Sequence, residues 1–140
     1  MLKDEVCRDV LLAYPDYDSS AEKLELYVDA SGAGAGVTLM QKQGGKHRTI
    51  AYASMSFSTT QMSYSATERE LVALRWGIQT IRSFVFGVPF LLFTDYKPLI
   101  FLDFMSAHNS RLMRTLEELA EYNFEVRYIP GPSNESADFL

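Results

Sequence analysis

Three acidic residues stand at the boundaries of short apolar segments, where a carboxylate adds little to packing and is well placed to bind a metal. Asp29 ends the apolar run 24–28, Asp95 ends the run 90–94, and Glu70 lies one turn inside a predicted helix. Ligands at the ends of neighbouring strands in an α/β sheet converge at the carboxyl edge of that sheet. The three positions therefore predict divalent-metal phosphoryl chemistry.

Helical geometry distinguishes Glu70 from its neighbour Glu68. Residues three, four, seven or eight positions apart share a helix face, and Glu70 shares its face with an apolar set: Ala73, Leu74, Gly77, Ile78 and Ile81. Glu68 is rotated away by roughly 200° and completes a capping box with Ser65. A carboxylate on a packed stripe loses solvation unless something pairs with it. A metal shared with the two aspartates is a better partner for Glu70 than a neighbouring arginine.

The elements that position these acids begin with three predicted strands. The strands are Leu24 to Ala30, Gly36 to Gln41 and His47 to Ser54. Each has alternating apolar and polar residues or is bounded by turn-forming residues. Gly44 and Gly45 between the last two are typical of a hairpin, and the glycine-rich stretch 32–36 allows a tight reversal between the first two. An antiparallel meander is expected.

The pattern then changes to helical periodicity over residues 64–86. Later segments predict a buried strand from Pro89 to Thr94, a short helix from Pro98 to Phe104, a longer helix from Ser110 to Tyr122 and a last strand from Phe124 to Ile129. A final helix has barely begun where the sequence stops. The order βββαβααβ indicates an α/β fold with a mixed sheet covered by helices. The helix over 64–86 has a buried stripe made of Leu71, Leu74, Ile78, Ile81 and Val85.

Composition narrows the class of protein. The 140 residues are 47% hydrophobic, which suits one domain with a proper core, and no stretch reaches the length of a membrane span. We expect residues 1–20 to be a linker or the tail of an upstream domain, and residues 21–140 to form the domain itself. The single cysteine, Cys7, excludes an internal disulfide and favours a reducing compartment, the cytoplasm.

The net charge of −5 argues against a stand-alone nucleic-acid binder, because affinity for phosphate depends on clustered Lys and Arg. A catalytic module rich in metal-binding carboxylates is acidic when free. Its hold on a polyanion would then come from bound cations and from a neighbouring domain.

Five further segments stand in a fixed order along the chain: Tyr27–Ser31, Ile50–Ser54, Tyr64–Leu71, Phe93–Leu99 and Tyr128–Asp138. Together they resemble the ribonuclease H domain of gypsy-type long-terminal-repeat retrotransposon polyproteins, and the similarity runs from about residue 14 to the C-terminus. The resemblance implies a ribonuclease H-like fold, with a five-stranded mixed sheet of order 3-2-1-4-5 flanked by helices and a truncated C-terminal helix. It also implies hydrolysis of the RNA strand of RNA/DNA hybrids during reverse transcription, beside an upstream polymerase domain, in the cytoplasm or in virus-like particles.

The resemblance carries four acidic residues over to Asp29, Glu70, Asp95 and Asp138. A two-metal mechanism uses ions about 3.5–4 Å apart to activate water and to stabilise the leaving oxygen. Asp29 would bridge the ions, Glu70 and Asp95 would hold the one nearer the leaving 3′ oxygen, and Asp138 the one that activates water. Oxygen ligands favour Mg²⁺, with Mn²⁺ as a substitute.

Substrate contacts are predicted at four further positions. Backbone amides near Ser31 could contact a 2′-hydroxyl, and Lys97, Arg111 and Arg114 could contact phosphates. Solvated helix faces explain the three cations equally well. The aromatic residues Trp76, Phe84 and Phe86 are interpreted as core or as an interface with the polymerase.

Two other functions remain open. One is a catalytically weak or inactive module that supports a reverse transcriptase or a domesticated retroelement protein. The other is an integrase-like strand-transfer enzyme. The order of the acidic residues along the chain disfavours it, because the glutamate of its acidic triad should come last.

Two features of the C-terminal segment bear on the level of activity. Residues 129–138 contain no histidine for product release, and the chain ends two residues after Asp138. We therefore expect weak activity from this fragment alone.

Overall fold

A computed structural model describes residues 12–94 and 110–128 of the chain. It contains one sheet with strand order β3-β2-β1-β4-β5. Neighbouring strands β1, β2 and β3 are antiparallel, whereas β1 with β4 and β4 with β5 are parallel. The predicted α/β class and the order 3-2-1-4-5 are confirmed. The strands are β1 (Leu24–Ala30), β2 (Gly34–Gln43), β3 (Lys46–Ser56), β4 (Phe90–Thr94) and β5 (Phe124–Tyr128).

Both predicted reversals between the antiparallel strands are present. Gly44 and Gly45 have φ angles of 62° and 81°, which most other residues avoid and which a tight hairpin of this hand requires. Between β1 and β2 the backbone N–H of Ser31 donates to the carbonyl of Gly34 at 2.8 Å. The meander is therefore closed by two short turns.

The helical segment predicted over 64–86 is interrupted, contrary to the single helix expected. It divides into α3 (Ala66–Thr80) and α4 (Arg82–Val85), with Ile81 between them at φ −104° and ψ 21°. The turn at Ile81 lets both Ile81 and Val85 stay buried while the chain bends toward β4. A short helix that was not predicted, α2 (Thr59–Met62), precedes α3.

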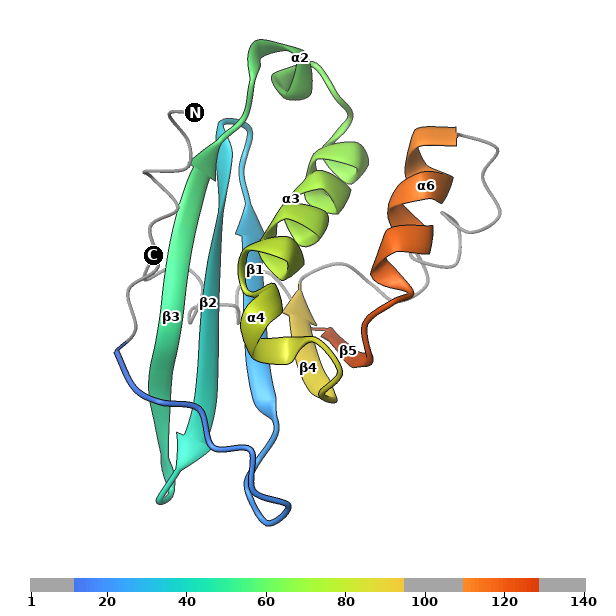
Figure 1. The fold of residues 1–140 in the computed structure, drawn as a ribbon. Coiled ribbons are helices and arrows are strands. Elements are labelled where there is room, and N and C mark those ends of the chain that lie inside the picture. The colour runs from blue at the N-terminus through green and yellow to red at the C-terminus, as the bar shows by residue number, and fades with distance from the viewer. Residues whose placement is uncertain (1–11, 95–109, 129–140) are drawn as a thin grey trace.

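Helix α6 (Ser110–Leu119) ends three residues before the predicted Tyr122. Figure 1 shows α3 and α4 lying over one face of the sheet, with α6 beside α3. The predicted short helix over 98–104 lies outside the described residues. No helix in the two described stretches is long and apolar enough to cross a membrane.

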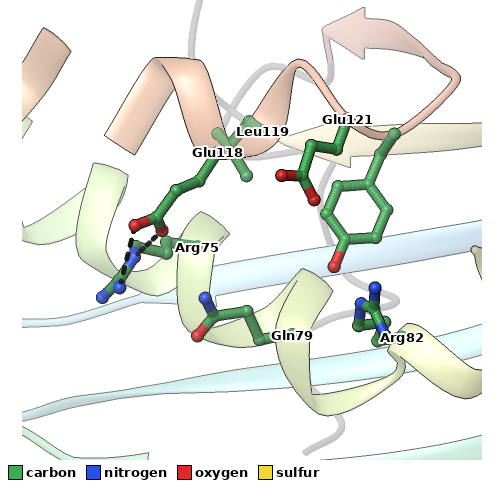
Figure 2. Close-up of a pocket in the computed structure, with 7 residues that line it drawn as sticks. Arg75, Gln79, Arg82, Glu118, Leu119 and Glu121 are labelled. Atoms are coloured by element: carbon green, nitrogen blue, oxygen red, sulfur yellow. Dashed lines mark hydrogen bonds and ion pairs between the residues drawn. The ribbon is translucent and has the colours of Figure 1, made fainter. Parts of the chain in front are cut away.

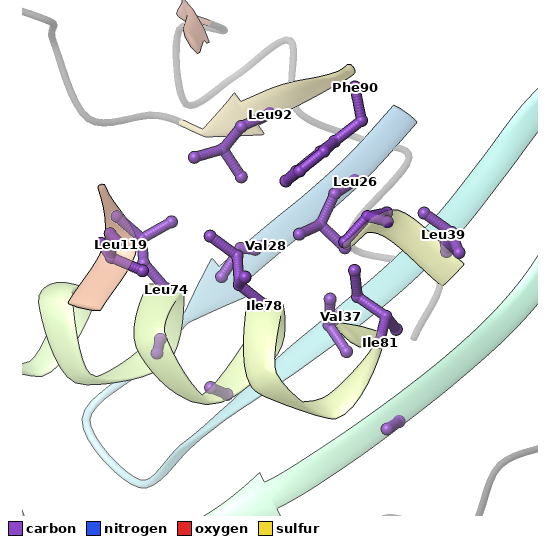
Figure 3. Close-up of a cluster of buried hydrophobic side chains, with 14 of the residues drawn as sticks. Leu26, Val28, Val37, Leu39, Leu74, Ile78, Ile81, Phe90, Leu92 and Leu119 are labelled. Atoms are coloured by element: carbon purple, nitrogen blue, oxygen red, sulfur yellow. The ribbon is translucent and has the colours of Figure 1, made fainter. Parts of the chain in front are cut away.

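The main core lies between α3 and the sheet. Figure 3 shows Leu74 and Ile78 of α3 against Val28 and Val37, and all five residues of the predicted stripe are buried. At Gly77 an added Cβ would lie 3.4 Å from side-chain atoms of both Val28 and Val37. The glycine therefore allows α3 to approach β1 and β2 closely, which fixes the height of the helix above the sheet.

The segment 12–22 is held to the sheet by one buried amide. Gln41 is 0% exposed, and its Oε1 accepts from the backbone N–H of Asp16 at 2.8 Å. Its Nε2 donates to the carbonyls of Asp16 at 2.8 Å and Glu22 at 2.7 Å. The backbone N–H of Leu12 also donates to the carbonyl of Ile50 at 3.0 Å. The described part of the stretch interpreted as a linker, from residue 12 onward, thus contacts the sheet directly.

Replacing Gln41 with Leu should lower the free energy of unfolding by about 1–3 kcal/mol, because it removes three part-buried hydrogen bonds to the backbone of Asp16 and Glu22. Urea unfolding measures the change. Gln79→Leu, at an exposed glutamine on α3, is the control and should change stability by about 0.5 kcal/mol or less. Equal effects of the two substitutions would show that Gln41 does not anchor the segment.

Candidate active site at the carboxyl edge of the sheet

The parallel strands bring their carboxyl ends to one edge of the sheet. Tyr27 of β1 is in register with Phe93 of β4, and Thr94 is in register with Tyr128 of β5. Asp29 lies on β1 close to this edge and is half-buried. Its partner on β2 is Gly36, which has no side chain to crowd the carboxylate. The edge therefore carries a half-buried carboxylate at the end of β1, beside the end of the parallel strand β4.

Glu70 lies in the amino-terminal half of α3. Figure 1 shows the amino-terminal half of α3 at the same end of the molecule as the carboxyl end of β1. The Glu70 side chain is half-buried. Glu68 has the local role predicted for it, because Ser65 Oγ accepts from the Glu68 N–H at 3.1 Å and Glu68 Oε1 accepts from the Ser65 N–H at 3.2 Å. The capping box is confirmed.

Arg69 makes two contacts that the sequence did not reveal. Its Nη1 donates to the carbonyl of Tyr64 at 2.6 Å and to that of Met62 at 3.3 Å. These bonds hold the connector between α2 and α3, immediately before the turn that bears Glu70. A second capping box, between Ser58 and Gln61, starts α2. The serine-to-glutamine spacing at 58–61 was the local signal that could have predicted α2.

The predicted substrate contacts have unequal support. Ser31 Oγ accepts from the N–H groups of Ala33 and Gly34, each at 3.2 Å, so this side chain shapes the turn after Asp29. Arg114 is exposed on α6. The Arg111 side chain and the whole of Lys97 lie outside the described structure. Their contacts with a substrate stay predictions.

The predicted metal ligands are only partly within the described structure. Asp29 and Glu70 are described, whereas Asp95 and Asp138 are not. Within residues 12–94 and 110–128, no group of three or more His, Cys, Asp or Glu is arranged to hold a metal. The four-carboxylate site therefore stays a prediction.

Comparison with known proteins decides the family. A family model described as the RNase H-like domain found in reverse transcriptase matches residues 19–122. The chain belongs to this family. It is 37% identical over 139 residues to the Pol polyprotein of transposon 412 and 32% identical over 133 residues to that of transposon gypsy, both from Drosophila melanogaster. These matches include 99% and 94% of this chain, but the chain spans only 11% and 12% of the length of the two polyproteins.

Solved structures confirm the fold of this ribonuclease H-like domain. The foamy viral protease-reverse transcriptase in complex with an RNA/DNA hybrid matches with a TM-score of 0.65 at 21% identity, over 79% of this chain and 15% of that one. LC11-RNase H1 in complex with an RNA/DNA hybrid matches with a TM-score of 0.59 at 17% identity, over 84% and 93%. The predicted resemblance to gypsy-type polyproteins is confirmed.

The sheet face that bears Asp29 is supported by an aromatic stack in this ribonuclease H-like domain. The rings of Tyr27 and Phe93 are parallel within 12°, with centroids 4.6 Å apart. Burial raises the pKa of the Tyr27 phenol, and its 2.8 Å hydrogen bond to Glu25 Oε1 raises that pKa further. Tyr27 therefore stays neutral and acts as packing. His47, predicted to be a surface residue, is exposed and contacts Glu25 at 3.1 Å.

Helix α6 is joined to α3 by a two-point ion pair. Figure 2 shows Arg75 facing Glu118, with Nε bonded to Oε1 and Nη2 bonded to Oε2 at 3.4 Å. The hydrogen bond from Arg75 lowers the pKa of the Glu118 carboxyl from its ordinary 4.5. Buried Leu119 adds the apolar part of the same contact. Together they fix α6 over the edge of α3.

This pair predicts a pH-dependent contribution to stability. Because the folded pKa of Glu118 is depressed, the stabilisation is present above the unfolded pKa and is lost as pH falls through the folded value. Both side chains are more than a third exposed, so Glu118→Gln should cost only about 0.5 kcal/mol at pH 7. Urea unfolding at pH 7 and at a pH below the folded pKa tests this, with exposed Glu117→Gln as control. A cost that persists in acid would rule out the ion pair as its cause.

Proposed function

We propose that this domain is a divalent-metal-dependent endonuclease that hydrolyses the RNA strand of RNA/DNA hybrids during reverse transcription of a retroelement. The observation that carries the proposal is the parallel pairing of β1 with β4 in a sheet of order 3-2-1-4-5. That pairing brings Asp29 to the edge at which β4 ends, directly before Asp95 in the sequence.

The chemistry of the donor set fits Mg²⁺, with Mn²⁺ as a substitute. Asp29 and Glu70, joined by Asp95 and Asp138, would supply hard oxygen ligands. When bound, paired ions supply water activation and stabilisation of the leaving oxygen. Without cations, four neighbouring carboxylates would repel one another, which favours cation binding at this edge.

The hybrid is the substrate class that the relatives favour. The foamy viral enzyme and LC11-RNase H1 were both solved in complex with RNA/DNA hybrids. The net charge of −5 means that binding would depend on cations and on the polymerase region of the same polyprotein. The relatives are Pol polyproteins of which the chain spans about a tenth.

The direct test is cleavage of an end-labelled RNA/DNA hybrid by the chain, alone and with the downstream residues of its polyprotein restored. We expect the RNA strand to be cut only in the hybrid, with 5′-phosphate and 3′-hydroxyl products. EDTA should stop the reaction, and Mg²⁺ or Mn²⁺ should restore it. Restoring the downstream residues should raise the rate.

Cleavage of single-stranded RNA at an equal rate, or cleavage in EDTA, would contradict the proposal. A chain that neither binds Mg²⁺ by titration calorimetry nor cuts the hybrid in either length would be the non-catalytic module instead. Equal rates for the two lengths would show that Asp138 needs no downstream support.

A further inference from the structure

An exposed aromatic residue, Phe86, directly follows α4 (Arg82–Val85), the short helix after α3 in Figure 1. Phe86 is 51% exposed, whereas Trp76 and Phe84 pack against the core. The Arg82 guanidinium carbon lies 4.2 Å from the Phe86 ring centroid. Tyr122 meets Phe86 edge-on, with centroids 6.0 Å apart and an angle of 83°. We call Arg82, Phe86 and Tyr122 the aromatic patch.

Arg82 has spare hydrogen-bonding capacity. Over the two described stretches it forms no ion pair with a carboxylate. A guanidinium presents its N–H donors in a planar fork that suits a bidentate contact with a planar anion such as a carboxylate. Arg82 therefore has donors available for an acidic group from outside the domain.

A hollow of about 330 Å³ adjoins the aromatic patch between α3 and α6. Figure 2 shows Arg82 and Gln79 on one side of it, with Leu119 and Glu121 on the other. The Arg75–Glu118 ion pair lies along the same hollow. The hollow is large enough for a side chain and combines apolar and charged walls.

We propose that the aromatic patch and this hollow form the docking site for the polymerase region of the same polyprotein, which places a carboxylate on Arg82 and an apolar side chain in the hollow. Arg, Phe and Tyr are enriched at protein interfaces, and Arg and Tyr are also enriched among the residues that contribute most of the binding energy. The inference rests on membership of the family and does not require the domain to cleave RNA.

Three observations favour this occupant. Tyr17, in the stretch predicted to be a linker from an upstream domain, donates to the carbonyl of Phe84 at 2.7 Å, so that stretch passes beside the aromatic patch. The matched stretch is about a tenth of each polyprotein relative. The hollow is lined by two arginines, Arg75 and Arg82, and two glutamates, Glu118 and Glu121, so it lacks the excess of cations that a nucleic-acid backbone requires.

Binding of the chain to the polymerase region of its own polyprotein, supplied as a separate polypeptide, tests the proposal by titration calorimetry. Arg82→Gln and Phe86→Ala should each weaken the dissociation constant about tenfold or more. The matched controls are Arg48→Gln and Tyr52→Ala, two exposed residues on β3, and each should stay within about twofold of wild type. Circular dichroism and thermal unfolding confirm that all four variants are folded.

The hybrid-cleavage rate of the isolated chain should be unchanged by Arg82→Gln, which separates this proposal from the proposed function. Four results would each overturn it: no binding by wild type, equal weakening by the β3 controls, self-association of the chain that depends on Phe86, or loss of hybrid binding in Arg82→Gln.

Discussion

Replacing Asp29 with Asn should reduce hybrid cleavage by about a hundredfold or more while leaving the domain folded. The substitution keeps the shape of the side chain and removes its negative charge at the carboxyl end of β1. An amide holds a divalent cation less well than a carboxylate does, so the loss should follow from weaker metal binding. Single-turnover cleavage of a labelled hybrid in Mg²⁺ measures the effect, and the loss should be smaller in Mn²⁺.

The control for this prediction is a pair of glutamates two residues apart on α3. Glu70→Gln should lose activity as Asp29→Asn does. Glu68→Gln should retain it, because glutamine also completes a capping box with Ser65. A wild-type rate in Asp29→Asn, or equal losses at Glu68 and Glu70, would contradict the assignment of these carboxylates.

Replacing Gly34 with Ala should destabilise the domain by about 1–3 kcal/mol. A Cβ at Gly34 would lie 2.3 Å from the carbonyl oxygen of Met55, a backbone atom that cannot turn aside. The turn from Ser31 to Gly34, directly after Asp29 and Ala30, would then have to shift. We therefore expect a lower midpoint in urea unfolding together with a reduced cleavage rate.

Gly32→Ala, in the same turn, is the matched control. An added Cβ there meets nothing within 4 Å, and Gly32 is not among the glycines with positive φ. Its stability should stay within about 0.5 kcal/mol of wild type. If the two substitutions had the same effect, close approach of β2 to β3 at Gly34 would not be the cause.

Local patterns predicted most of the fold. Alternation marked the strands, and the 3.6-residue period marked the stripe on α3 that includes Leu71, Leu74 and Ile78, all of which are buried. The capping box at Ser65 fixed where α3 begins. These features depend on neighbours a few positions apart, so one sequence is enough to reveal them.

Contacts between distant positions were not predictable in the same way. Gln41 bonds to Asp16 and Glu22, which are 25 and 19 positions away. In the sequence, Gln41 is simply a polar residue at the end of a predicted strand, and nothing nearby indicates these partners. The turn at Ile81 arises because the chain must bend to reach β4 with its apolar residues still buried. Arg69 contacts carbonyls in a connector whose path is set by α2.

The candidate site also has a part that local patterns predicted and a part that they did not. Asp29 and Glu70 were selected from strand-end position and helix face, and the structure places them on β1 and α3 as expected. The parallel pairing of β1 with β4, which brings a second strand end to Asp29, joins residues far apart in sequence and was implied only by the resemblance. Asp138 likewise came from the resemblance, and it lies with Asp95 outside the described residues.

The central claim is that carboxylates from β1 and α3 bind one cluster of divalent cations, and Mn²⁺-induced broadening of amide NMR resonances tests it most directly. Substoichiometric Mn²⁺ should broaden the signals of Asp29 and Glu70 first, and Asp29→Asn should abolish the effect. Broadening that begins at another acidic stretch, such as residues 117–121, while Asp29 and Glu70 stay sharp, would contradict the account.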